Sequence, residues 1–312
     1  MTSLRDTLRL CLVAGGTLCM SAASPASTNE TAQGARSPDA SAVETARAVA
    51  QPPSHSAVRA DDHAPAWSPD GLRIAFASNR GTQASTDIYV ANADGSNPTR
   101  VTGADSIDRD PVWSPNGRQI AFVSSRSDAH GWDVYVVEAD GTSLTNLTGA
   151  DGCDHRPSWS PDGRRIAFES DRAGHADIYV VDADGGGATR LTKDGADDLW
   201  PLWSPDGKSI AFTRGDIFVM AADGTGARNV TKAAGYHAGA TWSPDGRSLA
   251  FMSLRARPGG WTIAVADVET SETRALTSGA ARDAAPTWSP DGQRIAFAST
   301  RDGSHGLFVV DA

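Results

Sequence analysis

One motif, repeated six times, constrains the fold of this chain more than any other feature. Each copy reads Trp-Ser-Pro-Asp-Gly, with Asn in place of Asp in the second copy, and a short strand that alternates bulky and small residues follows. The copies begin 46, 46, 44, 39 and 46 residues apart, at Trp67, Trp113, Trp159, Trp203, Trp242 and Trp288. A fixed period of this length indicates stacked units of supersecondary structure.

Each unit contains four strand signals separated by turn signals. In the second unit the strand signals are residues 111–113, 120–123, 133–137 and 144–148. The Ser-Pro-Asp-Gly and Ala-Asp-Gly segments between them are turn sequences, and turns about every 8–12 residues indicate an antiparallel meander. Six such sheets bury both of their faces when they stand radially around a common shaft. The sequence therefore predicts an all-β, six-bladed β-propeller of four-stranded antiparallel blades over residues 54–312.

The last unit supplies only three strand signals before the sequence ends at Ala312. By spacing, the missing outer strand corresponds to a segment near residues 52–56. We expect this N-terminal strand to pair into the sixth blade and close the ring. Pro52 and Pro53 are compatible with that position because proline is tolerated on an outer edge strand. A closed ring leaves few unpaired sheet edges, so we expect a monomer.

The residues before the propeller indicate export. Arg5 and Arg9, the apolar run 10–20 and the small residues 21–23 have the pattern of a secretory signal peptide over residues 1–23. The apolar run is shorter than the roughly 20 residues that span a bilayer, so no membrane insertion is expected after cleavage. Residues 24–53 are rich in Ala, Ser and Pro and predict a disordered linker. The mature protein is expected to be periplasmic or secreted.

Charge and motif content exclude several functions. The chain has a net charge of −10, which argues against binding to nucleic acid or to an anionic membrane surface. No G-x-S-x-G elbow, dinucleotide-binding motif or P-loop is present, so we predict no catalytic residue and no cofactor.

Two faces of the propeller are expected to differ. The Ser-Pro-Asp-Gly and Ala-Asp-Gly turns form one, here called the turn face; the loops before the first strand and after the second form the other, the loop face. In five of the six units, an aspartate stands five residues before the motif tryptophan; the fifth unit has His237 there. We expect these aspartates to form a ring at the loop-face mouth of the shaft: Asp62, Asp108, Asp154, Asp198 and Asp283. Such a ring would suit a cation. The alternative is structural pairing with the arginine that follows the second strand of each unit.

Candidate ligand-binding residues also gather on the loop face. All histidines except His55 fall there, and Trp200 interrupts the repeat three residues before Trp203. We expect a ligand surface formed by His63, Arg109, His155, Trp200 and His237. The alternatives are that exposed loops accumulate histidine and that Trp200 packs against a neighbouring loop. No pair of histidines has close ligand spacing, so no metal site is predicted.

The run W-S-P-D-G-x-x-I-A-F-x-S-x-R, with D-I-Y-V-x-x-A-D-G and L-T after it, resembles the TolB-type, WD40-like propeller repeat. The resemblance covers about residues 54–312 and omits the α/β domain that precedes the propeller in TolB proteins. It implies a non-catalytic binding module for a protein or peptide partner in the cell envelope. The alternatives are a metal-dependent lyase or hydrolase that acts on a sugar or lactone at the mouth, and a purely structural envelope component.

Overall fold

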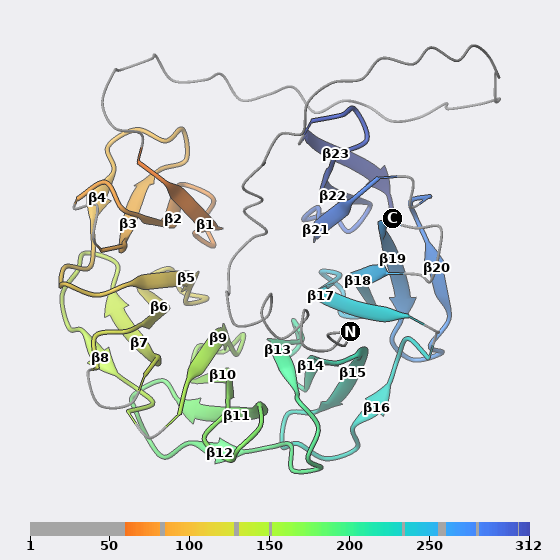
Figure 1. Cartoon of the computed structure of the whole chain (residues 1–312), viewed down its shortest axis with the longest axis horizontal. Helices are drawn as coiled ribbons and strands as arrows, with labels where there is room; N and C mark the ends of the chain where they lie inside the picture. Colours follow the sequence, from red (N-terminus) through yellow and green to blue (C-terminus); the bar gives the residue numbers. More distant parts are fainter. Residues whose placement is uncertain are drawn as a thin grey trace, which may run out of the picture. The chain divides into compact units, whose positions relative to one another are not determined.

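The computed structural model describes residues 60–81, 85–127, 131–149, 152–232, 235–254, 260–278, 281–304 and 306–312. These residues belong to one compact unit, 43–312. They form strands, turns and loops, and this part of the chain contains no helix and therefore none that could cross a membrane. Successive sheets follow one another around a centre, with the first strand of each sheet innermost (Figure 1).

The strands form six antiparallel meanders, β1–β4, β5–β8, β9–β12, β13–β16, β17–β20 and β21–β23, here called blades 1 to 6. Their bounds are β1 (Asp62–Trp67), β2 (Arg73–Ser78), β3 (Asp87–Asn92), β4 (Thr99–Arg100), β5 (Asp108–Trp113), β6 (Gln119–Ser124), β7 (Asp133–Glu138), β8 (Thr145–Asn146), β9 (Asp154–Trp159), β10 (Arg165–Ser170), β11 (Asp177–Asp182), β12 (Thr189–Arg190), β13 (Leu199–Trp203), β14 (Ser209–Arg214), β15 (Asp216–Ala221), β16 (Arg228–Asn229), β17 (Tyr236–Trp242), β18 (Ser248–Leu254), β19 (Trp261–Asp267), β20 (Thr273–Ala275), β21 (Asp283–Trp288), β22 (Arg294–Ser299) and β23 (Gly306–Asp311).

The predicted six-bladed propeller of four-stranded antiparallel blades is confirmed. Blades 1 to 5 have four strands each, and within the described residues blade 6 has three. The segment 52–56, predicted to complete blade 6, lies outside the described residues, as do the predicted signal peptide 1–23 and linker 24–53. Ring closure by an N-terminal strand therefore stays a prediction.

The repeated turn is stabilised by its own side chains. In blade 1, the Ser68 hydroxyl donates to Asp70 Oδ1 at 2.5 Å, and the same carboxylate oxygen accepts the Leu72 N–H at 3.0 Å. Gly71 closes the turn with a φ of +70°, a conformation that suits glycine. The same pattern of bonds recurs in the later copies, so each blade receives an identical hairpin.

In blades 2, 3, 5 and 6 the motif tryptophan donates a hydrogen bond to the preceding blade. Trp113 is 8% exposed, and its Nε1 donates to the carbonyl of Ala66 in blade 1 at 3.0 Å. Trp159, Trp242 and Trp288 make the same bond to their preceding blades. Beside them, the phenylalanine of each second strand fills the space between sheets, and those of blades 2 to 6 are at most 1% exposed: Phe122, Phe168, Phe212, Phe251 and Phe297. Buried alanines of the preceding blade, such as Ala75, let the sheets approach.

Two blade faces differ from this pattern. Trp67 of blade 1 is 59% exposed, and Leu307 of blade 6 is 68% exposed. Their counterparts elsewhere, such as Trp113 and Ile88, are 8% and 0% exposed. The described residues therefore leave uncovered the side of blade 1 that carries Trp67 and the side of blade 6 that carries Leu307.

Candidate functional site

The five aspartates of the predicted ring each lie beside an arginine of their own blade. In blade 2, Asp108 is fully buried and its Oδ2 lies 2.6 Å from Arg126 Nη2. Its other oxygen accepts the Ser124 hydroxyl at 2.6 Å. The corresponding ion pairs are Asp62–Arg80, Asp154–Arg172, Asp198–Arg214 and Asp283–Arg301. Burial raises the pKa of Asp154 and Asp198, while the hydrogen bonds from their serine, threonine and arginine neighbours oppose that shift. Each of these five carboxylates therefore has a cationic partner within its own blade.

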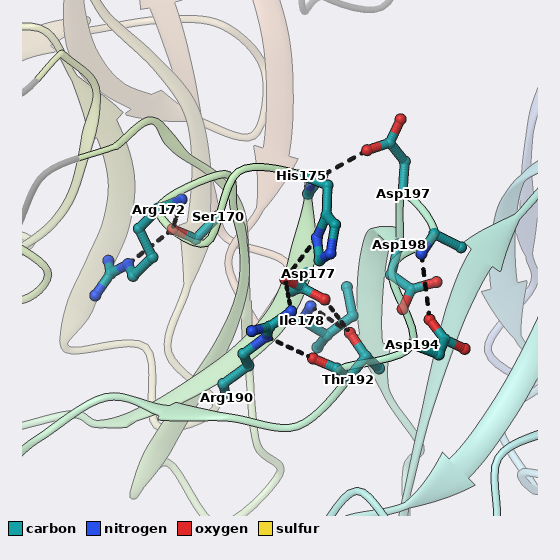
Figure 2. Close-up of polar contacts among 12 residues, drawn as sticks. Ser170, Arg172, His175, Asp177, Ile178, Arg190, Thr192, Asp194, Asp197 and Asp198 are labelled. Carbon is teal, nitrogen blue, oxygen red and sulfur yellow. Dashed lines mark hydrogen bonds and ion pairs between the residues drawn. The ribbon is translucent and has the colours of Figure 1, made fainter.

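A second set of carboxylates, at the start of the third strands, is also engaged within the blades. In blade 3, Asp177 Oδ2 lies 2.7 Å from Arg190 Nη2 and 2.9 Å from His175 Nδ1 (Figure 2). Thr192 accepts the Ile178 N–H at 2.9 Å and tightens the same corner. The equivalent pairs in other blades are Asp87–Arg100, Asp133–Asn146 and Asp216–Asn229.

His237 lies below the surface. It is 1% exposed and takes the place that aspartate holds in the other inner strands. Its Nδ1 lies 2.8 Å from Asp216 Oδ1 of the preceding blade, and its ring meets Phe251 edge-on at 5.3 Å. Because a ligand cannot reach it, we omit His237 from the surface proposed below.

His63 and His155, both predicted to belong to the ligand surface, lie on blades 1 and 3, with blade 2 between them. His63 is half-buried in β1, on blade 1. His155, in β9 of blade 3, contacts Arg109 of the intervening blade 2, with 3.4 Å between Arg109 Nη2 and His155 Nδ1. Within the described residues, no group of three or more His, Cys, Asp or Glu side chains could hold a metal ion. His130 and His305 lie outside the described residues.

Every innermost strand carries a β-bulge at the same place. In β5 the pairing with β6 shifts register between Arg109 and Val112, and equivalent shifts occur in the other five blades. The residue three before the motif tryptophan has a φ between +50° and +61° in all six strands: Ala64, Asp110, Arg156, Trp200, Gly239 and Ala285. Left-handed backbone at five non-glycine residues is strained, and bulges of this kind change the direction of a side chain.

The bulged segments of blades 2 to 4 bring together a set of arginine, tryptophan, histidine and glutamate side chains. We call it the inner cluster: Arg109, Trp132, His155, Arg156, Glu169 and Trp200. The Arg109 guanidinium lies over the Trp132 ring, 3.8 Å from its centroid, and Trp132 is tilted against His155 at 6.0 Å. Burial and the charges of Arg109 and Arg156 lower the pKa of His155 to about 4, so the imidazole is neutral at pH 7.

Glu169 is the buried carboxyl of the inner cluster. It is 9% exposed and lies directly opposite His155 in the β9–β10 pairing. Its Oε2 accepts the backbone N–H of Trp200 from blade 4 at 2.7 Å. Burial raises the pKa of Glu169 to about 7, with the Trp200 N–H opposing that shift. Glu169 therefore titrates in the physiological range.

Trp200 connects blades 3, 4 and 5. The Arg156 guanidinium lies 5.0 Å from the centroid of its ring. On the blade 5 side the indole packs so close to Gly239 that a Cβ there would come within 3.1 Å of Trp200 Cζ3. The indole is half-buried, which combines packing against a neighbour with partial exposure.

Three members of the inner cluster were not among the predicted ligand residues: Trp132, Arg156 and Glu169. Glu169 could have been recognised from the sequence by comparing the repeats. The equivalent position of the second strand in the other blades holds Ala77, Val123, Thr213, Met252 and Ala298. A carboxylate among small and apolar residues at a buried position departs from the repeat. Trp132 similarly replaces Thr86, Ala176 and Gly215.

A shallow pocket also lies among the turns of blades 4 and 5, lined by Arg228, Arg247, Asp267 and Glu269 among others. It belongs to the turn face, and Arg228 already donates to the carbonyl of Val268. Both signs of charge are present there, and its residues come from the repeated hairpins. The inner cluster, built from departures from the repeat, is the better candidate site.

Comparison with known proteins identifies a single family. The family model of the TolB beta propeller domain matches residues 48–131, 127–217 and 225–312. A search of curated protein sequences finds no match.

Solved structures with the same fold include two TolB proteins and a lyase. TolB from Acinetobacter baumannii is 25% identical with a TM-score of 0.61; the aligned region covers 77% of this chain and 63% of that one, less than two thirds of its length. The structure of putative TolB from Agrobacterium tumefaciens is 24% identical with a TM-score of 0.59, covering 80% and 89%. An oligogalacturonate lyase in complex with manganese is 17% identical with a TM-score of 0.58, covering 79% and 87%.

Proposed function

Because this chain belongs to the TolB β-propeller family, we propose that it is an exported, non-catalytic module that binds a protein or peptide partner in the cell envelope. The inner cluster on the loop face is the proposed binding surface, and His63 on the neighbouring blade 1 extends it. The protein acts in the periplasm or after secretion, with the segment 1–23 as its export signal.

The observation that carries this proposal is the composition of the inner cluster. Trp132 and Trp200 are half-buried, and each lies against a guanidinium group. Tryptophan and arginine are the residues most enriched at energetically dominant positions of protein interfaces. The cluster rests on strands of three adjacent blades, so its geometry is fixed before a partner arrives, which lowers the entropic cost of binding.

Affinity capture from an envelope fraction tests the proposal. The tagged wild-type protein, a His155→Ala, Trp200→Ala double variant and an Arg164→Ala control would be compared by quantitative mass spectrometry. Arg164 is exposed in the turn-face hairpin of blade 3, so its loss changes charge away from the proposed surface. We expect a partner enriched equally by wild type and control and at least tenfold less by the double variant. Equal enrichment by all three proteins, with unchanged melting temperatures, would reject the proposed surface.

The alternative is a metal-dependent lyase or hydrolase that acts on a sugar or lactone at the mouth. The fold shared with an oligogalacturonate lyase in complex with manganese keeps it open. Elemental analysis of protein purified without chelator distinguishes the two functions. A stoichiometric transition metal that is lost on substitution of His63 and His155 would favour the enzyme over the binding module.

A further inference from the structure

Blade 6 differs from the other blades at its outer edge. Among the described residues it ends at its third strand, whereas each of the other five blades continues with a fourth. The third strand, β23, pairs in this part of the chain with β22 alone. Its Leu307 is 68% exposed, while the equivalent Ile88 of blade 1 is fully buried. An edge strand presents a row of backbone N–H and C=O groups, so β23 is a template for a further strand.

The fourth strand of blade 1 shows what such a strand requires. The Val101 N–H donates to the carbonyl of Ile88 at 2.8 Å, and the Thr102 hydroxyl accepts the Ile88 N–H at 2.9 Å. Val101 is buried in the same apolar cluster as Ile88 and Val90. Two positions before it, Thr99 pairs with Val90. The fourth strand is therefore held by one apolar side chain, one hydroxyl and the alternating N–H groups of its backbone.

The same two hydrogen bonds recur in blades 2 to 5. In each of these blades an apolar residue donates its N–H to the third strand, and the threonine after it accepts an N–H from that strand. The five fourth strands thus share one sequence, here called the outer-strand pattern: Thr or Arg, any residue, Val or Leu, then Thr. They are residues 99–102, 145–148, 189–192, 228–231 and 274–277.

The chain's own segment at the corresponding place keeps only part of this pattern. Every threonine of the pattern stands six residues before the ring-aspartate position of the next blade, and the same spacing counted back from Asp62 ends at Ser56. The segment 53–56, which lies outside the described residues, reads Pro-Ser-His-Ser. Pro53 has no N–H for the ladder, and His55 stands where the other blades have valine or leucine. A strand with the full pattern would make a ladder bond and an apolar contact that this segment cannot make.

We propose that β23 binds a β-strand of a protein partner that follows the outer-strand pattern, and that this strand displaces the segment 53–56. The partner strand completes blade 6: its apolar residue packs against Leu307, and its threonine hydroxyl accepts the Leu307 N–H. Recognition of this kind takes affinity from main-chain hydrogen bonds and specificity from alternate side chains. The edge shares no residue with the inner cluster, so this inference goes beyond the proposed function and does not rest on it.

Fluorescence polarisation with a labelled peptide and the full-length protein tests the inference. The probe has the sequence of residues 187–194, Gly-Ala-Thr-Arg-Leu-Thr-Lys-Asp, which contains the outer-strand pattern of blade 3. Methylation of its leucine N–H, the donor to the Leu307 carbonyl, should weaken binding at least tenfold. Methylation of its arginine N–H is the matched control and should leave binding unchanged, because successive N–H groups of a strand point to opposite sides. Valine in place of the second threonine keeps the shape, removes the acceptor and should weaken binding about fivefold.

A change in the chain's own segment tests the displacement. Pro53→Thr together with His55→Val gives this segment the outer-strand pattern except for its final serine, which keeps the hydroxyl. Because a tethered strand competes at high effective concentration, the double variant should weaken binding of the peptide at least tenfold. It should also raise the melting temperature, which distinguishes competition from misfolding. Pro38→Thr makes the same kind of change far from the pattern and should have no effect.

The outcomes separate this inference from the proposed function. Equal binding of the two methylated peptides, or unchanged binding by the double variant, would overturn strand addition at β23. Failure of the unmodified peptide to bind wild type would overturn it as well. None of these results bears on capture of an envelope partner through His155 and Trp200, which the affinity experiment above tests by itself.

Discussion

Replacing Glu169 by glutamine should stabilise the protein at alkaline pH by a predictable amount. The pKa of this buried carboxyl is about 7 in the folded protein, against an ordinary value of 4.5. Between these two values the folded protein keeps a proton that the unfolded chain has released. The stability that Glu169 contributes is therefore present at low pH and is lost as the pH rises towards 7. The loss over the whole window is about 3 kcal/mol.

Glutamine keeps a carbonyl oxygen for the Trp200 N–H and cannot ionise. The free energy of unfolding of Glu169→Gln should therefore rise relative to wild type by about 3 kcal/mol across that window, most of it between pH 5 and pH 8. His155 acts with the opposite sign. Its pKa is lowered from 6.5 to about 4, so its contribution is lost as the pH falls through that range. Because both proteins retain His155, its effect cancels in the comparison.

Urea unfolding followed by tryptophan fluorescence, at several values between pH 5 and pH 8, measures this difference. Glu272→Gln removes a carboxylate from the exposed surface and serves as the matched control, with an expected change within about 0.5 kcal/mol at every pH. Stability curves of wild type and Glu169→Gln that stay parallel to within that margin would refute the assignment of Glu169 as a buried group that titrates near neutrality.

Two further predictions concern the contacts within and between blades. Arg126→Met should destabilise the protein by about 3 kcal/mol, because it leaves the fully buried Asp108 without its partner, whereas Arg80→Met should cost less than about 1 kcal/mol, since its partner carboxylate is 45% exposed; equal losses in chemical denaturation would contradict the burial argument. Trp113→Phe should lower the free energy of unfolding by about 1 kcal/mol more than Trp203→Phe. Both rings are buried, but of the two only Trp113 Nε1 has a hydrogen-bond acceptor among the described residues. Equal losses in a calorimetric comparison would show that this hydrogen bond does not contribute to stability.

The blade architecture could be predicted because each signal in the sequence acts locally. Ser68, Asp70 and Gly71 specify their turn through bonds that span at most five residues, so the turn is readable without knowledge of the fold. Alternation around Phe76 then gives the face of each strand. The sixfold repetition then predicts how the sheets pack, since six similar sheets have one compact arrangement.

The inner cluster could be predicted only in part, because it depends on the bulge. Strict alternation places the residue three before the motif tryptophan on the opposite side from the residue four before it. A one-residue register shift reverses that assignment, and nothing in the local sequence requires the shift. His155 was therefore recognised as a candidate, while Arg156, its neighbour, was not.

The short connection between β14 and β15 causes a second difference between the sequence-based prediction and the structure. Arg214 was grouped with the arginines that follow the second strand, but it stands two positions earlier, where Ser124 stands in blade 2. The connection to β15 is the single residue Gly215, with a φ of +73°. Arg214 nevertheless reaches the same carboxylate, with Nε and Nη2 at 2.6 Å and 2.7 Å from Asp198. The ion pair between Arg214 and Asp198 could therefore be predicted from the sequence, whereas the position of Arg214 along the backbone could not.

The left-handed residue in every inner strand separates specificity from stability. At the five non-glycine positions this side chain is not fully buried between the sheets, so its type can change from one blade to the next without loss of the hairpin or the tryptophan contacts. Gly239 is different, because a Cβ there would come within 2.7 Å of Met252 Cε and 3.1 Å of Trp200 Cζ3. A library that keeps Gly239 and randomises the five other codons should yield many folded proteins with different binding preferences. The natural set of side chains would be one combination among them: Ala64, Asp110, Arg156, Trp200, Gly239 and Ala285.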